Sequence, residues 1–121
     1  MTKFGTMLEQ RTICLVPIPF SDLIALKRRL VLIISPDSYN DNCNDILVMA
    51  ITSNLLIKEN AVHIEQNDMQ SGVLKETSVV RIDKIYSISS ELVIKNFGKI
   101  NSETYLKIID KLLQFIEIKR S

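Results

Sequence analysis

Short runs of aliphatic, β-favouring residues recur along this chain, and the connections between them are too short for repeated crossover helices. The first three runs span residues 13–18, 30–35 and 45–52. Parallel neighbours need connections of roughly a dozen residues or more, so antiparallel pairing is expected. The second and third runs have almost no polar interruption, which predicts strands buried on both faces of a sheet.

Prolines mark the ends of the first two runs. Pro17 and Pro19 lack a backbone N–H, which places the end of the first strand near Phe20. The second run stops at residues 36–38 (PDS), a sequence typical of a turn.

Two further strands are predicted downstream. Residues 61–65 alternate weakly between apolar and polar, and residues 78–88 (SVVRIDKIYSI) alternate over a longer stretch. The alternation breaks near Asp83 and Lys84, where we expect a bulge or a bend.

A helix closes the chain. After an expected turn at Gly98, Asn101 or Ser102 can cap a helix whose apolar residues recur every three or four positions. The face expected to lie on the sheet consists of Tyr105, Leu106, Ile109, Leu112, Leu113 and Ile116. The predicted fold is therefore mainly β with a C-terminal helix, arranged as a small, partly open antiparallel barrel.

Length and composition limit the class of protein. A chain of 121 residues with 46% apolar residues has room for one domain, spanning residues 1–121. The net charge of +1 means that an RNA partner would bind a local basic patch. The N-terminus lacks the apolar core of a signal peptide and no run is long enough to span a membrane, so we expect a soluble, cytoplasmic protein.

Several kinds of site are absent from the sequence. Cys14 and Cys43 form no CxxC pair and His63 is the single histidine, so no metal site is expected and both thiols should remain reduced. One histidine also excludes a two-imidazole acid/base pair within one subunit. The three glycines stand too far apart to form a phosphate-cradling loop, and we assign the polar connection around Gly72, with Lys75, a structural role.

Two polar clusters are candidate ligand sites. Lys27, Arg28 and Arg29 stand just before the second predicted strand, where a guanidinium can grip a phosphate, although such clusters are usually only solvated. Thr52 and Ser53 end the third strand with hydroxyl groups, which is also common at a plain strand-to-turn transition.

Four blocks of the sequence, in order, resemble the MazF/PemK family of toxins. They are residues 13–23 (ICLVPIPFSDL), 29–35 (RLVLIIS), 50–53 (AITS) and 78–88. The similarity extends from about Gln10 to the C-terminal helix. It implies an SH3-like or plasmid-maintenance-toxin barrel and a homodimer. It also implies that the protein cleaves single-stranded RNA such as mRNA without metal or cofactor. A cognate antitoxin is expected to inhibit it, and the complex with that antitoxin is expected to bind DNA.

The resemblance also implies catalytic residues. The family's arginine falls on Arg29 and its threonine on Thr52. When a 2′-hydroxyl attacks the adjacent phosphate to form a 2′,3′-cyclic phosphate, a guanidinium can stabilise the growing negative charge and a threonine hydroxyl can donate to it. An arginine, with a pKa above ~12, is a poor general base, so the residue that acts as the general base is not assigned.

Further residues are expected to bind the substrate. Phe20 offers a face on which a base can stack, Arg28 is a second cation for phosphate, and Ser21 and Ser53 border the same mouth.

The sequence also departs from the family pattern. Arg11 and Thr12 replace the usual Gly-Asp before the first strand, and Leu30 replaces a proline after the catalytic arginine. These departures motivate an alternative, a catalytically weak or silent relative that binds RNA or antitoxin. A third hypothesis is a CcdB-like gyrase poison, but that family relies on a C-terminal tryptophan and this chain has none.

Overall fold

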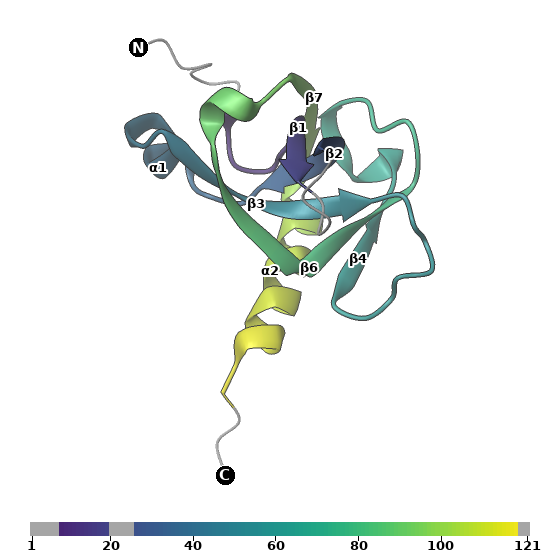
Figure 1. The fold of residues 1–121 in the computed structure, drawn as a ribbon. Coiled ribbons are helices and arrows are strands. Elements are labelled where there is room, and N and C mark those ends of the chain that lie inside the picture. Colours follow the sequence, from purple (N-terminus) through teal and green to yellow (C-terminus); the bar gives the residue numbers. More distant parts are fainter. Residues whose placement is uncertain (1–7, 20–25, 119–121) are drawn as a thin grey trace.

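The computed structural model describes residues 8–19 and 26–118. Over these residues one antiparallel sheet of seven strands, in the order β4-β6-β3-β2-β1-β7-β5, curls into a half-barrel against which helix α2 packs (Figure 1). The strands are β1 (Thr12–Pro19), β2 (Leu26–Ile33), β3 (Asp45–Thr52), β4 (Ala61–Ile64), β5 (Met69–Gly72), β6 (Ser78–Ser89) and β7 (Lys95–Ile100). The helices are α1 (Asp37–Asn42), α2 (Ser102–Ile116) and the 3₁₀ turns η2 (Gln66–Asp68) and η3 (Ser90–Leu92).

This architecture confirms the expected mainly-β fold with a C-terminal helix. The edge strands β4 and β5 do not pair with each other, so the barrel is partly open over the described residues. Within the described residues, no helix is long and apolar enough to cross a membrane.

Strand β2 begins four residues earlier than predicted. Lys27, Arg28 and Arg29 lie inside this strand and not before it, because each pairs with a residue of β1. A pattern of apolar residues does not detect the polar residues at the start of a strand. Here those residues belong to the strand because they pair with β1. The end of β1 near Phe20 is confirmed, since the strand ends at Pro19.

Two apolar clusters cover opposite faces of the central strands. Ile13 of β1 and Leu32 of β2 belong to the cluster beneath α2, whereas their neighbours Cys14 and Val31 belong to the other. Each large side chain buried in this way contributes roughly 1.5–3 kcal/mol. Burial on both faces is thus confirmed for Val31, Leu32 and Ile33 of β2 and for most of β3, where Leu47 is 37% exposed, whereas Lys27 and Arg28 at the start of β2 are exposed.

The expected bend in the long strand is present. Met49 of β3 pairs with Ile85 of β6, yet Ile51 pairs with Val80, so β6 holds the extra residues of an irregular ladder. At this point the Arg81 guanidinium donates to both carboxylate oxygens of Asp83, each at 3.1 Å. The hydrogen bonds from Arg81 hold the pKa of Asp83 below its usual value.

Helix α2 starts as predicted but turns a different face to the sheet. The Asn101 side chain caps the helix by accepting from the Thr104 backbone N–H at 2.8 Å. The most buried helix residues are Thr104 and Ile108, neither of which was in the predicted face. Tyr105 and Leu112 pack on the core as expected. The prediction was wrong for three residues with exposures of 56–61%: Leu106, Leu113 and Ile116.

The glycines that stand far apart in sequence meet in space. Gly98 lies within β7 and not in a turn, and it pairs with Gly72 of β5. A Cβ on Gly72 would lie 2.1 Å from the carbonyl oxygen of Phe97, and one on Gly98 would lie 2.2 Å from that of Ser71. Only glycine permits such a close approach of two backbones.

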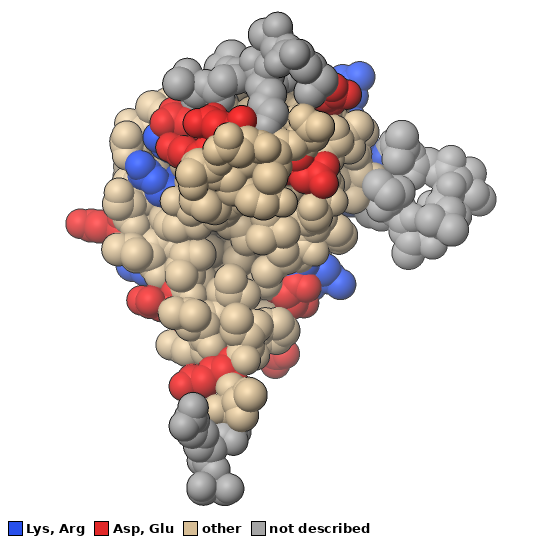
Figure 2. All heavy atoms as spheres, turned by 90° about the vertical axis from the view of Figure 1, so that its left-hand side faces the viewer, with Lys and Arg blue, Asp and Glu red and all other residues tan. Residues whose placement is uncertain are grey.

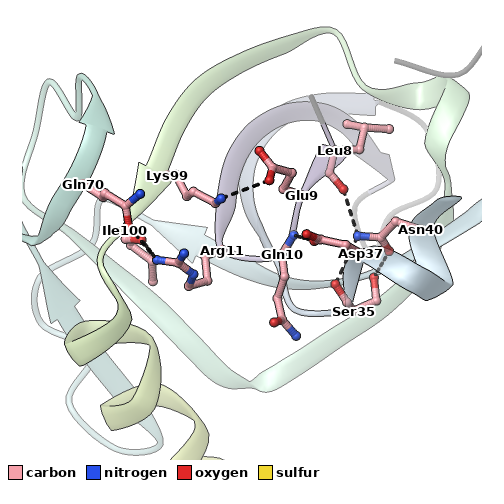
Figure 3. A network of polar contacts seen from close by, with 10 residues as sticks. All are labelled: Leu8, Glu9, Gln10, Arg11, Ser35, Asp37, Asn40, Gln70, Lys99 and Ile100. Carbon is pink, nitrogen blue, oxygen red and sulfur yellow. Dashed lines mark hydrogen bonds and ion pairs between the residues drawn. The ribbon is translucent and has the colours of Figure 1, made fainter. Parts of the chain in front are cut away.

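Polar contacts fasten the residues before β1 to the rest of the barrel (Figure 3). Arg11 Nη1 donates to the carbonyl oxygen of Ile100 at 2.8 Å and to Gln70 Oε1 at 2.9 Å. Glu9 pairs with Lys99 at 3.2 Å. These contacts join β1, β5 and β7 at one end of the sheet.

Candidate active site

A cavity of about 350 Å³ opens where the first residues of β2 meet the last residues of β3. Residues 73–76, which follow β5, and Phe97 of β7 also line it. The volume lies at the lower end of the range of small-ligand pockets, roughly 300–1,000 Å³.

The antiparallel ladder between β2 and β3 brings the two candidate catalytic residues to this cavity. Val31 pairs with Ala50, and the same register runs on toward Arg29 and Thr52, both of which line the cavity. Arg29 and Thr52 are half-buried, so each is partly shielded from water. A charged group in such a setting acts more strongly on a ligand than it does in bulk water.

The Thr52 hydroxyl has a fixed position. Its oxygen accepts from the backbone N–H of Asn54 at 3.2 Å, just after the strand ends. A hydroxyl oxygen that accepts one bond can still donate its own proton. The strand-to-turn geometry therefore orients a donor and is compatible with a functional role for the residue.

Of the six residues predicted for the site, the cavity brings four together. Arg28, Arg29, Thr52 and Ser53 all line it. Phe20 and Ser21 lie outside the described residues, so their roles remain predictions.

Sequence reasoning missed the wall contributed by the connection after β5. Lys75 and Glu76 line the cavity, although this segment was assigned a structural role. Ser78, at the start of β6, lines it as well and donates from its hydroxyl to the carbonyl oxygen of Glu76 at 3.0 Å. No local pattern predicts this wall, because it depends on how β5 packs beside β7.

The cavity is locally basic although the chain is nearly neutral. Its described lining carries three cations, Arg28, Arg29 and Lys75, and one carboxylate, Glu76. The chain as a whole has a net charge of only +1. A concentration of cations at one concave site favours an anionic ligand such as a phosphodiester.

Other reactive groups lie elsewhere. Cys14 is buried in the core, and burial raises the pKa of its thiol to about 12, so it is not a nucleophile at neutral pH. His63 is exposed on β4, with its Nε2 3.2 Å from the carbonyl oxygen of Ile57, and it does not line the cavity. The described residues contain no group of three metal-ligating side chains.

Comparison with known proteins identifies the family. A sequence model of the PemK-like, MazF-like toxins of type II toxin-antitoxin systems matches residues 9–116. The chain belongs to this family. Membership in the PemK/MazF family confirms the resemblance carried by the four sequence blocks and gives no support to the gyrase-poison hypothesis. No curated protein sequence matches the chain.

Solved structures of MazF toxins share the fold. A mycobacterial endoribonuclease in complex with its cognate antitoxin superposes with a TM-score of 0.74 at 15% identity, covering 93% of this chain and 98% of that one. The Mycobacterium tuberculosis toxin MazF-mt6 gives a TM-score of 0.72 at 18% identity, with coverages of 91% and 100%. A MazE-MazF structure from Deinococcus radiodurans gives 0.73 at 16% identity, with coverages of 92% and 97%. At these identities the likeness establishes the fold alone.

Proposed function

We propose that the chain is the toxin of a type II toxin-antitoxin pair and cleaves single-stranded RNA in the cytoplasm without a metal ion. The observation that carries this proposal is the cavity in which Arg29 and Thr52 lie with two further cations, Arg28 and Lys75. Membership in the PemK/MazF family supports it, and the resemblance of the sequence blocks implies the family's arginine and threonine at these two positions.

The chemistry follows from the charges in the cavity. The ribose 2′-hydroxyl gives up its proton to a general base that is not assigned, and its oxygen forms a bond to the adjacent phosphorus. The bond from phosphorus to the 5′-oxygen of the next nucleotide breaks, and that oxygen takes up a proton. The products are a 2′,3′-cyclic phosphate and a 5′-hydroxyl. Arg29 offsets the negative charge that grows on the non-bridging oxygens, and Thr52 donates a hydrogen bond to one of them. Arg28 and Lys75 hold the flanking phosphates.

The test is RNA cleavage in EDTA with mapping of the product ends. We expect Arg29→Ala and Thr52→Ala to lower the rate by about 100-fold or more, the usual effect of removing one donor to a developing oxyanion. Thr52→Ser keeps a hydroxyl and should retain most of the activity. Lys58→Ala, which removes an exposed cation outside the cavity, is the matched control. Intact RNA after incubation with folded wild-type protein would overturn the proposal.

A binding-only relative is the second candidate, and one feature of the cavity favours it. Leu30, which replaces the family's proline, itself lines the cavity beside Arg29. A side chain of different shape there can displace the guanidinium from its productive position. Tight RNA binding without any product, lost in Arg29→Ala, would identify this candidate.

The partner surfaces belong to the same proposal. Two of the similar solved structures are an endoribonuclease in complex with its cognate antitoxin and a MazE-MazF structure, which supports a cognate antitoxin as the inhibitor of this chain.

We also propose a homodimer. In the face shown in Figure 2, charged side chains lie mainly at the margins and leave a broad uncharged area. On α2, an apolar stripe consists of Leu106, Ile109, Leu113 and Ile116.

We infer that a second copy of the chain covers the apolar stripe on α2. Three of its residues are more than half exposed, and Ile109 is partly exposed. With about 3.6 residues per turn, Leu106 and Leu113 point away from the face that Thr104 and Ile108 bury against the sheet, so the helix has a second apolar face that the sheet does not cover. Surfaces of this kind mark protein interfaces, and twofold pairing is the commonest symmetry.

A further inference from the structure

Phe97 gives the cavity an aromatic wall that phosphate binding does not require. We propose that this wall is a nucleobase subsite, in which the base of a nucleotide next to the cleaved phosphate stacks on the Phe97 ring. The inference rests on the proposed ribonuclease function, since it names how the same cavity holds its substrate.

The mixed chemistry of the cavity lining is the first argument. The part from β2 and β3 includes Arg28, Arg29, Thr52 and Ser53, and the part from β7 and the connection after β5 includes Phe97, Val73 and Leu74 beside the charged Lys75 and Glu76. Of these residues, Val73 is 58% exposed. Cations and hydroxyl groups bind a phosphate and its sugar. Exposed apolar side chains instead gain free energy when an apolar surface of the ligand covers them. A nucleotide offers both an anion and a flat π-face at adjacent positions.

The rigidity of the wall is the second argument. The carbonyl oxygen of Phe97 accepts from the backbone N–H of Val73 at 3.1 Å, so a backbone hydrogen bond joins these two lining residues. Directly beside them, Gly72 and Gly98 let β5 and β7 approach closely. A ligand that stacks on a ring with a fixed backbone loses little conformational entropy from the protein, which favours binding.

The environment of the ring is the third argument. Phe97 is half-buried and packs against the core cluster beneath α2, while also lining the cavity. Lys95 Nζ lies 5.0 Å from the ring centroid, within cation–π distance. The cation adds positive charge next to the ring.

Nucleotide binding tests the subsite independently of catalysis. Titrations of wild-type protein with the four nucleoside 5′-monophosphates and with ribose 5-phosphate, followed by NMR, compare ligands that differ only in the base. We expect at least one nucleotide to bind about 5-fold or more tightly than ribose 5-phosphate, as base–aromatic stacking predicts. Phe97→Leu should abolish that preference, and Phe97→Tyr should retain it.

Matched variants separate the subsite from general effects. Phe115→Leu removes an exposed aromatic ring of α2 that does not line the cavity, and it should leave the preference unchanged. Arg29→Ala should weaken nucleotides and ribose 5-phosphate alike. Equal binding of all ligands to the wild type, or a preference that survives in Phe97→Leu, would refute the subsite.

The outcomes also distinguish the subsite from the ribonuclease proposal. A Phe97-dependent base preference without RNA cleavage would leave the subsite standing and remove the ribonuclease. RNA cleavage that proceeds at the wild-type rate and at the same positions in Phe97→Leu would remove the subsite and leave the ribonuclease. If Phe97→Leu does not fold, Phe97→Tyr and the wild-type ligand comparison still decide the question.

Discussion

Arg11 adopts a backbone conformation that glycine takes without strain, with φ at +78°. The resemblance to the family implies a glycine where this chain has Arg11, and a glycine would adopt this conformation without strain. A left-handed non-glycine residue costs about 1–2 kcal/mol. The bonds from the Arg11 guanidinium to Ile100 and Gln70 offset that cost and make the substitution tolerable.

This account predicts that Arg11→Ala and Arg11→Gly differ in stability. Arg11→Ala loses the hydrogen bonds and keeps the strain, so it should lower the free energy of unfolding by about 1–3 kcal/mol. Arg11→Gly loses the same bonds but relieves the strain, and should be more stable than the alanine variant by about 1 kcal/mol. Urea unfolding measures both. Equal stabilities would show that the backbone at this position carries no strain.

At the scale of elements, the contact between β5 and β7 decides the shape of one cavity wall. Gly72 and Gly98 have positive φ values of +82° and +127°, and each faces the backbone of the opposite strand. Their contact places Val73 and Phe97 at the cavity. Two glycines 26 positions apart in the sequence therefore act as one structural unit.

Gly98→Ala should be strongly destabilising. The new methyl group would overlap the carbonyl oxygen of Ser71, and alanine rarely adopts this φ, so a loss of at least about 3 kcal/mol is expected. Ser71→Ala, at an exposed position of the same strand pair, should stay within about 0.5 kcal/mol of the wild type. Chemical unfolding followed by circular dichroism compares the two. Wild-type stability of Gly98→Ala would mean that the strands do not approach this closely.

At the scale of the whole molecule, helix α2 has two apolar faces and the barrel covers only one. Ile108 is fully buried against the sheet, whereas Leu106 and Leu113 remain more than half exposed. The exposed face has no role in the fold of a single chain. Assembly with a second copy would remove it from water.

The dimer proposal predicts that lysines on the stripe give a folded monomer. In Leu106→Lys/Leu113→Lys, burial of the charges in a twofold interface would be too costly, while the isolated chain should tolerate them at exposed positions. Sedimentation at micromolar concentration should show a dimer for the wild type and a monomer for the variant. Gln114→Lys adds one lysine on another face of α2 and should remain dimeric. A monomeric wild type, or a monomeric Gln114→Lys, would contradict the interface.

The sequence alone was sufficient for features that depend on neighbouring residues. The aliphatic run at residues 45–52 predicted β3 with the bounds that it has, and Asn101 predicted the start of α2. The family blocks also pointed to Arg29 and Thr52, which the structure places in one cavity, although their catalytic roles stay predictions. A strand, a helix cap and a motif are each determined by residues within a few positions of one another, so each can be recognised in a short stretch of sequence.

Only the tertiary structure decided the features that depend on distant residues. Strand β2 extends back to Leu26 because β1 pairs with its polar residues. Lys75 and Phe97 line the same cavity as Arg29 because β5 packs beside β7, and the direction in which α2 turns its apolar residues depends on the sheet beneath it. Each of these arrangements is stabilised by contacts between segments far apart in the chain, and such contacts leave no periodic signal in either segment alone.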